Sequence, residues 1–413
     1  MLHPLIRFTF ALLIISILSV FTARVIGDAQ PPHAWLTWEG ADHRTPIDVF
    51  ISDGRRNVNL TYTPRAADAK PIWSADGRLA WIASGDLFVW DGGQIHKVTH
   101  YQADREFAYT EMPIAWSADG RLAWITIRIM GRTLSVWDGE QIQVVSEFPS
   151  EYYTPFMWTA AGDLVWYAPS VEGWMIQVWD GEGVRVIEEL ADENQLWLDS
   201  EAPVWVSHEG GHPSMRMWDG TQVITLQDGG MWGSKYAWSA DGRLAWIDDH
   251  GQINLWDGER VRSVPPLENT QTVPEFPLVW SPDGRLTWIA RDNLTSQLVI
   301  AAWAGETSFQ LVESAGDSVY PTWSADGRLA WVTSRYPHAD QAHVWDGTTT
   351  ASFALPGVSL DAPIWSADGR LVFVTEAPYG GQGSILVWEE AALVPLGLTN
   401  SPYPDLHWSP PMN

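Results

Sequence analysis

The sequence predicts an all-β protein, a β-propeller of four-stranded antiparallel blades, and two observations lead to this prediction. The nine-residue phrase Trp-Ser-Ala-Asp-Gly-Arg-Leu-Ala-Trp stands four times, at Trp73–Trp81, Trp116–Trp124, Trp238–Trp246 and Trp323–Trp331. Related phrases place the starts of successive units 39 to 43 residues apart, with further starts at Trp158, Trp197, Trp280, Trp365 and Trp408. A fixed period of this length with strand-like units is typical of a propeller.

Each repeat unit predicts a four-stranded meander. The first strand ends in Ile-Trp-Ser, and Ala-Asp-Gly-Arg follows as a tight turn, because Asp bonds its own backbone and Gly accepts a positive φ. The second strand, Leu-Ala-Trp-Ile, has the β-branched and aromatic residues that strands prefer. The third strand ends at Val-Trp, and Asp-Gly is a second hairpin turn. The fourth strand is the run after it, as in residues 142–145 and 184–187.

The recurring tryptophans and aspartates of the unit favour structural roles. Three positions of the unit account for 25 of the 28 tryptophans. Rings of this size suit the gap between stacked sheets, whereas an aromatic ligand platform would need only a few of them. Turn chemistry likewise explains the repeated aspartate without a metal or catalysis. These aspartates are Asp76, Asp119, Asp241, Asp283, Asp326 and Asp368.

The two ends of the repeat region predict one composite blade. Residues 34–63 hold second-, third- and fourth-strand material but lack a first strand, and residues 404–409 supply a first strand and nothing more. Together they would join the ends of the ring and remove its open edges. Eight complete units plus this composite give nine blades. An eight-bladed ring with loose terminal strands is the alternative, since common propellers have four to eight blades.

The repeat resembles the WD40-like Pro-x-Trp-Ser-Pro-Asp-Gly repeat of TolB-type propellers. Trp280-Ser281-Pro282-Asp283-Gly284 matches the core of that pattern, and Asn59-Leu60-Thr61 looks like the Leu-Thr that commonly precedes it. The resemblance spans about residues 34–409 and implies the propeller fold. It implies little about activity, because such propellers serve as scaffolds, binding modules and enzyme subdomains. The chain lacks room for the separate N-terminal α/β domain of the Tol-system protein, so that protein's partners are not carried over.

Composition and the N-terminus predict one domain outside the cytoplasm. The net charge of −27 argues against nucleic acid and anionic membrane surfaces as partners, because both need basic patches. The chain has no cysteine, so it has neither disulfides nor thiolate sites. An apolar run at residues 8–23, flanked by Arg7 and Arg24, indicates a hydrophobic helix that is either a signal peptide or an uncleaved membrane anchor. We therefore divide the chain into residues 1–30, the targeting or anchor segment, and residues 31–413, a single propeller domain.

The sequence around each candidate motif for catalysis or metal binding argues against that function. His208-Glu209-Gly210-Gly211-His212 matches His-Glu-x-x-His, but that zinc chemistry needs a helix, and two glycines and Pro213 oppose one. His96 and His100 lie four apart in a predicted strand, about 13 Å from each other, so they cannot share a metal. Neither a Gly-x-Ser-x-Gly elbow nor a phosphate loop occurs. We expect no cofactor and identify no catalytic residue.

Loop lengths predict the binding face. The first hairpin of every unit has the same length, whereas the loops between strands two and three and the crossovers between units vary. Binding residues concentrate on variable loops of a rigid scaffold. Aromatic residues in these loops, outside the repeated positions, are the candidate binding residues: Tyr101, Tyr109, Trp174, Trp232, Tyr336 and Tyr379.

Two classes of function fit this reading. The first is a non-enzymatic extracytoplasmic binding or scaffold propeller, a monomer that docks a protein, peptide or cell-wall glycan on its variable face and meets the membrane only through its N-terminal segment. A sensor or receptor ectodomain is a version of it. The second is a glycan hydrolase or lyase with carboxylates at the channel mouth, for which a carboxylate pair about 5–9.5 Å apart would be the signature.

Overall fold

A computed structural model gives two compact units, Met1–Pro31 and Pro32–Asn413. The first unit, with the expected hydrophobic helix and anchor, lies outside the residues that the structure describes. In the second unit the structure describes residues 36–40, 48–52, 57–61, 71–99, 108–129, 131–149, 154–170, 173–190, 196–197, 203–207, 213–228, 235–313, 320–335, 338–355, 357–359, 362–376, 383–389, 392–399 and 407–409.

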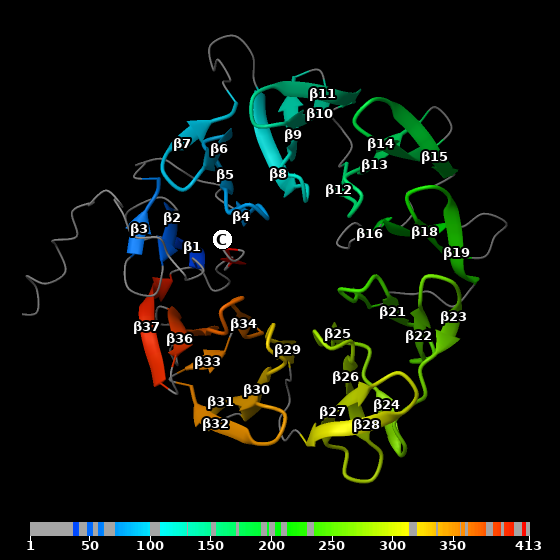
Figure 1. Cartoon of the computed structure of the whole chain (residues 1–413), viewed down its shortest axis with the longest axis vertical. Helices are drawn as coiled ribbons and strands as arrows, with labels where there is room; N and C mark the ends of the chain where they lie inside the picture. Colours follow the sequence, from blue (N-terminus) through cyan, green and yellow to red (C-terminus); the bar gives the residue numbers. More distant parts are fainter. Residues whose placement is uncertain are drawn as a thin grey trace, which may run out of the picture. The chain divides into compact units, whose positions relative to one another are not determined.

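The strands of these ranges form nine antiparallel sheets, which are the blades of a ring (Figure 1). The predicted count of nine is thereby confirmed. We number blades 1 to 8 along the chain. Blade 1 has β4 (Ile72–Trp73), β5 (Leu79–Ala83), β6 (Asp86–Trp90) and β7 (Ile95–Lys97). Blade 2 has β8 (Ala108–Trp116), β9 (Leu122–Arg128), β10 (Gly131–Trp137) and β11 (Ile142–Phe148). Blade 3 has β12 (Phe156–Trp158), β13 (Leu164–Pro169), β14 (Trp174–Trp179) and β15 (Val184–Leu190).

The next blades continue the same order. Blade 4 has β16 (Leu196–Trp197), β17 (Val204–Ser207), β18 (Ser214–Trp218) and β19 (Val223–Asp228). Blade 5 has β20 (Tyr236–Trp238), β21 (Leu244–Ile247), β22 (Ile253–Trp256) and β23 (Val261–Ser263). Blade 6 has β24 (Thr270–Thr272), β25 (Val279–Trp280), β26 (Leu286–Asp292), β27 (Leu298–Trp303) and β28 (Ser308–Glu313).

The last two numbered blades and a composite blade complete the ring. Blade 7 has β29 (Thr322–Trp323), β30 (Leu329–Arg335), β31 (His338–Trp345) and β32 (Thr350–Ala354). Blade 8 has β33 (Val358–Ser359), β34 (Ile364–Trp365), β35 (Leu371–Glu376), β36 (Gly383–Glu389) and β37 (Ala392–Thr399). The composite blade has β38 (His407–Trp408), β1 (Leu36–Gly40), β2 (Asp48–Ser52) and β3 (Asn57–Asn59).

The composite blade forms as the sequence predicted. The pairing order is β3-β2-β1-β38, and Leu36 pairs with Trp408 and Thr37 with His407. Trp408 also donates its indole N–H to the Ile364 carbonyl of blade 8, at 3.3 Å. One sheet thus contains both ends of the repeat region, which closes the ring without leaving an unpaired inner edge.

The second-strand tryptophans are the main contacts between blades, as predicted. Trp124 of blade 2 is 1% exposed and packs with Ala80 and Ile82 of blade 1. Its neighbours in the same strand, Ala123 and Ile125, pack on the other side with Trp166 of blade 3. Because side chains of a strand alternate between the two faces of the sheet, each second strand serves two interfaces at once. The cores between blades therefore form a continuous series around the ring.

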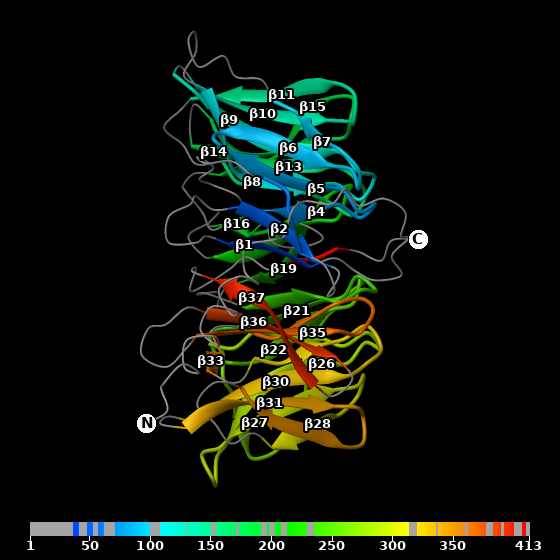
Figure 2. The ribbon, with the colours of Figure 1, turned by 90° about the vertical axis from the view of Figure 1, so that its left-hand side faces the viewer.

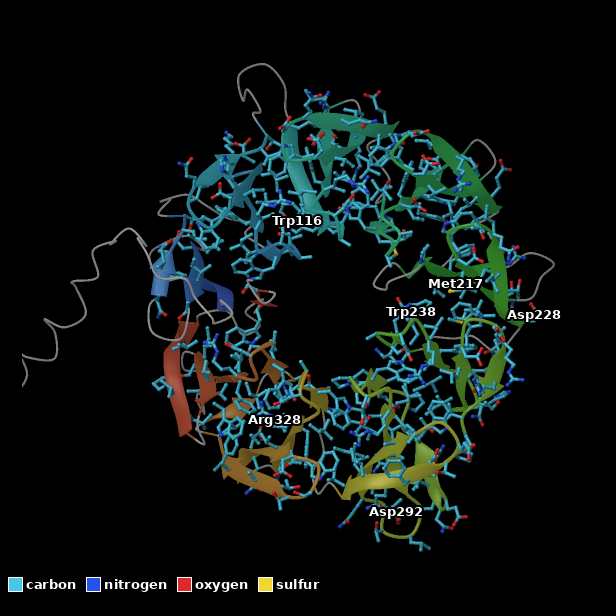
Figure 3. All side chains as sticks on the ribbon, in the orientation of Figure 1. Trp116, Met217, Asp228, Trp238, Asp292 and Arg328 are labelled. Atoms are coloured by element: carbon cyan, nitrogen blue, oxygen red, sulfur yellow. The ribbon has the colours of Figure 1, made fainter. Side chains whose placement is uncertain are left out.

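The first-strand tryptophans lie differently from those of the second strand. Trp116 is only partly buried, and Figure 3 shows it and Trp238 on the inner side of the ring. Its indole N–H donates to the Ile72 carbonyl of the preceding blade, at 3.2 Å. The same bond from innermost strand to innermost strand recurs from Trp158, Trp280 and Trp365. Position on the innermost strand explains the exposure, since one side of that strand faces no further sheet.

The sheets present two different ends. The hairpins between strands one and two and between strands three and four lie at one end of each sheet, which we call the turn face. The connections between strands two and three and the crossovers lie at the other end, the loop face; Figure 2 shows the strands running between the two faces. The structure adds strands on the loop face that the sequence did not predict. β24 and β33 are short strands of the crossovers that pair with the far ends of β26 and β35.

Candidate functional site

The turn face is built from a clamp that joins successive blades. In blade 1 the Ser74 hydroxyl donates to Asp76, the Arg78 guanidinium pairs with Asp76 at 2.8 Å, and Arg78 Nη2 donates to the Gly120 carbonyl of blade 2 at 2.7 Å. The same guanidinium lies 4.6 Å from the centre of the Trp116 ring. Six arginines make this contact with the next blade's tryptophan: Arg78, Arg121, Arg243, Arg285, Arg328 and Arg370.

The clamp fixes the charge of the turn aspartates. Partial burial alone would raise the pKa of Asp76, but hydrogen bonds from Arg78 and Ser74 outweigh it, so that the pKa lies below its usual value. The Arg243 hydrogen bond is the largest influence on Asp241 and lowers its pKa. These carboxylates are ionised and engaged within the protein. They agree with the structural role that the sequence predicted, and the arginine is the partner that it missed.

The clamp is interrupted at blades 3 and 4. Asp163 and Ala202 stand at the positions that carry arginine in the six clamped blades. At these two blades, polar side chains of the outer strands make the contacts to the next blade instead. Glu188 of blade 3 accepts the Trp205 indole N–H at 3.1 Å and pairs with Arg216 of blade 4 at 2.6 Å. The Glu188 side chain is only 8% exposed, so this charge is held almost entirely by the protein.

The next joint uses a neutral acceptor. Gln227 of blade 4 accepts the Trp246 indole N–H of blade 5 at 2.6 Å. The first-strand tryptophan of blade 5, Trp238, has a buried indole nitrogen without a hydrogen-bond partner in the described part of the chain. Burial raises the pKa of Asp163, the residue at the vacant arginine position. The segment from blade 3 to blade 5 therefore departs from the ring's repeated joint.

A groove of about 420 Å³ lies on the loop face of blade 6. It is lined by Gln271, Thr272, Val273, Pro274, Glu275, Phe276 and Arg291. The Phe276 ring packs edge-on against Tyr320, with ring centres 5.7 Å apart, and Tyr320 is 41% exposed. Val273 and Phe276 rest on the core between blades 6 and 7. The floor of the groove is thus fixed by packing while an aromatic pair faces solvent at its side.

Local turns hold this groove in place. Asn269 and Ser296 are non-glycine residues with positive φ, 57° and 60°, in the adjacent chain segments. The Asn293 amide donates to the Asn269 carbonyl at 2.9 Å, which ties the tip of the β26–β27 hairpin to the start of β24. Asp292 caps that tip by accepting the amides of Leu294 and Thr295, and Figure 3 shows it at the outer side of the ring. Hydrogen bonds to those amides lower the Asp292 pKa.

Arg291 is the cation of the groove. Its Nη1 donates to the Ser296 carbonyl at 3.1 Å, and the side chain is exposed. Within the described ranges it has no carboxylate partner, although Glu275 lines the same groove. In a chain of net charge −27, an arginine left without a counter-charge beside an aromatic surface is suited to bind a ligand carboxylate.

The structure places only two of the six predicted binding residues. Trp174 was expected in a loop, and this placement is wrong: it is the first residue of β14, is 8% exposed, and stacks on Tyr167 with ring centres 4.5 Å apart. Pairing of β13 with β14 brings the two rings together. Tyr109 lies on β8 rather than in the crossover. Their part in binding stays a prediction. The other four lie outside the described residues: Tyr101, Trp232, Tyr336 and Tyr379.

Of the residues at which the sequence analysis rejected a metal site, the structure describes one. His96, on β7, contacts the Asp91 carboxylate at 2.6 Å, and His100 and residues 208–212 lie outside the described residues. Among the residues that are described, no group of three or more His, Cys, Asp or Glu side chains could hold a metal ion. The described ranges also include no helix long and apolar enough to cross a membrane.

Comparisons with known proteins support the fold and go no further. Neither a family model nor a curated protein sequence matches the chain. A solved eukaryotic initiation factor is 12% identical with a TM-score of 0.60, covering 92% of this chain and 99% of its own. The dihydro-heme d1 dehydrogenase NirN is 14% identical with a TM-score of 0.52, covering 94% and 78%.

The TolB protein of Acinetobacter baumannii is also similar, at 14% identity over 75% of this chain and 86% of its own, with a TM-score of 0.34 on which no argument rests. Identities this low show the fold alone. Together with the nine sheets and the repeated clamp, they show that the chain is a β-propeller, consistent with the WD40-like, TolB-type repeat that its sequence resembles.

Proposed function

We propose that this protein is a non-enzymatic binding or scaffold propeller that works outside the cytoplasm and docks protein or peptide partners on its loop face. The observation that carries the proposal is the contrast between the two faces. On the turn face, repeated side chains satisfy one another within the clamp, as in the Ser74, Asp76 and Arg78 group. On the loop face of blade 6, Arg291 and the Phe276–Tyr320 pair border a groove and are available to a ligand.

Two further features support the proposal. Aromatic residues and arginine are the residue types most enriched at the energetic centres of protein interfaces, and the groove offers both. The apolar run at residues 8–23 supports a location outside the cytoplasm, with residues 1–30 as signal peptide or anchor. The similar folds of an initiation factor and a dehydrogenase leave the function open, because a fold does not define an activity.

Site-specific photo-cross-linking tests the docking face. A photoreactive phenylalanine analogue replaces Tyr320 on the loop face in one variant and Glu140, an exposed residue of a turn-face hairpin, in the control. Irradiation in the cell of origin should give a discrete protein adduct from the Tyr320 position and none from Glu140. Adducts from Glu140 alone, or from neither position, contradict the proposal.

Protease protection tests the location. The propeller should be digested by a protease added outside the sealed cytoplasmic membrane, and deletion of residues 2–30 should protect it. Protection of the full-length chain would contradict an extracytoplasmic role.

A further inference from the structure

The loop face of blade 6 carries a short strand whose second edge has no partner among the described strands. β24 is the end strand of the order β24-β26-β27-β28. Thr270, Gln271 and Thr272 pair with Asp292, Arg291 and Ala290 of β26. An end strand with free backbone groups is a template for another extended chain.

The hydrogen bonds at the two ends of β24 define which backbone groups are free. The Asn269 carbonyl and the Val273 amide both bond to the β26 side, at 2.9 and 3.0 Å. Backbone groups alternate sides along a strand, so those of Thr270 and Thr272 point away from β26. The Thr270 amide is taken by the Leu267 carbonyl, at 3.3 Å. Within the described ranges, the Thr272 amide and carbonyl and the Thr270 carbonyl therefore remain for an added strand.

The groove is lined by residues of β24, of the segment that follows it and of β26, and it supplies contacts for side chains of an added strand. Gln271 and Arg291 are cross-strand neighbours, and both line the groove with Val273 and Phe276. In an added strand, residues two apart project to the same face. One of them would pack an apolar or aromatic side chain on Phe276 while the other places a carboxylate at Arg291. Glu275, in the same groove, opposes a second carboxylate.

We propose that β24 is a strand-addition site for an extended peptide segment that carries an apolar or aromatic residue and a carboxylate two positions apart. Main-chain hydrogen bonds to Thr270 and Thr272 would supply affinity, and the groove would supply selectivity, as in other sheet-edge recognition. This inference rests on the proposed function, because it names the ligand class of the loop face.

Fluorescein-labelled hexapeptides titrated into the full chain, with anisotropy as the readout, test the site. The first probe is Thr-Phe-Thr-Glu-Thr-Thr. A second probe has Lys in place of Glu, a third has Phe and Glu adjacent, and a fourth is N-methylated at alternate residues to remove strand donors. The first should bind at least about tenfold more tightly than each of the others, the order expected for one charge-assisted contact. No saturable binding of the first probe up to about 1 mM, or equal binding of all four, overturns the proposal.

Charge reversal shows whether Arg291 makes the contact. Arg291→Glu should bind the Lys probe more tightly than the Glu probe, reversing the native order, and Arg291→Gln should bind the two alike. A melting temperature close to the native one for Arg291→Gln shows that the groove remains folded. Native selectivity in both variants overturns the proposal. If cross-linking from Tyr320 succeeds while all peptides fail, the loop-face function stands and strand addition falls.

Discussion

The guanidinium of Arg121 lies 4.6 Å from the centre of the Trp158 ring, and its Nη2 donates to the Gly162 carbonyl at 2.7 Å. Both contacts cross from blade 2 to blade 3. One side chain thus joins the turn of its own blade, through Asp119, to the ring and backbone of the next. The ring contact recurs in six blades. The described bonds to the next blade's glycine carbonyl come from Arg78, Arg121, Arg243 and Arg328, so the repeated turn also connects neighbouring blades.

Replacement of Arg121 by methionine should lower the free energy of unfolding by about 2 kcal/mol, through loss of a partly buried cation–π contact and a charged hydrogen bond. Urea denaturation measures the change. Arg121→Lys should recover less than half of it, because lysine lacks the planar fork. Arg128→Met, at an exposed arginine of the same blade, is the matched control and should change stability by no more than about 0.5 kcal/mol. Equal effects of Arg121→Met and Arg128→Met would contradict the clamp.

Removal of one partner of the Glu188–Arg216 pair should clearly lower the free energy of unfolding. Glu188→Ala leaves the guanidinium of Arg216 and the indole N–H of Trp205 without this acceptor, with an expected loss of about 3 kcal/mol. Glu188→Gln keeps an acceptor for the indole and should lose less. The same denaturation measurement checks both, with Glu189→Ala in the same strand as the control. A loss below about 1 kcal/mol in Glu188→Ala would mean that this joint does not hold blades 3 and 4 together.

Removal of residues 404–413 should destabilise the whole ring. The deletion takes away β38 and with it the pairing of Leu36 with Trp408, so β1 becomes an exposed inner edge. A clearly lower melting temperature and a greater tendency to aggregate are expected. Trp408→Ala, which keeps the strand but removes the ring under Arg370, should have an intermediate effect. A deletion variant that melts like the full chain would show that closure contributes nothing.

His343 should make the protein less stable as the pH falls below about 6.5. Burial lowers its pKa, and both ring nitrogens are engaged, with Thr333 at 2.9 Å and Ser352 at 2.8 Å. In the window between the lowered folded pKa and the unfolded value of 6.5, the unfolded state binds more protons. Stability is therefore present above that window and decreases through it as pH falls. Denaturation at pH 7 and pH 5 should show a smaller decrease for His343→Gln than for the native chain, whereas an identical decrease would exclude this histidine as a source.

Most of the fold could be predicted from the sequence because the same pattern of strands and turns recurs along the chain, once for each of the nine blades. The spacing of Trp73 and Trp81 predicted the first hairpin, and the out-of-phase ends predicted the composite blade. The role of the turn arginine was also within reach, since it recurs five residues after the first tryptophan. What the spacing could not show is that Arg78 contacts the next blade as well as the turn of its own.

The candidate groove could not be predicted, because it depends on segments that occur once. β24 belongs to a crossover of blade 6 whose sequence no other unit shares, and its pairing with β26 arises only in the folded sheet. Trp174 illustrates the opposite error. It was assigned to the loop between the second and third strands of its unit, yet the strand pairing places the ring on Tyr167. A residue's position relative to the repeat shows whether the same residue type recurs in other units. It does not show whether the side chain is buried or exposed.

The composite blade also has a consequence for the order of folding during synthesis. β1, β2 and β3 leave the ribosome among the first residues of the ring, whereas β38, which pairs with β1, comes after all eight numbered blades. Contacts this distant in sequence form slowly and late, after the local hairpins. The nascent chain must therefore carry an incomplete sheet through most of translation, with an exposed edge open to pairing with other chains. The β1 edge therefore stays without its β38 partner until the last of the numbered blades has been made.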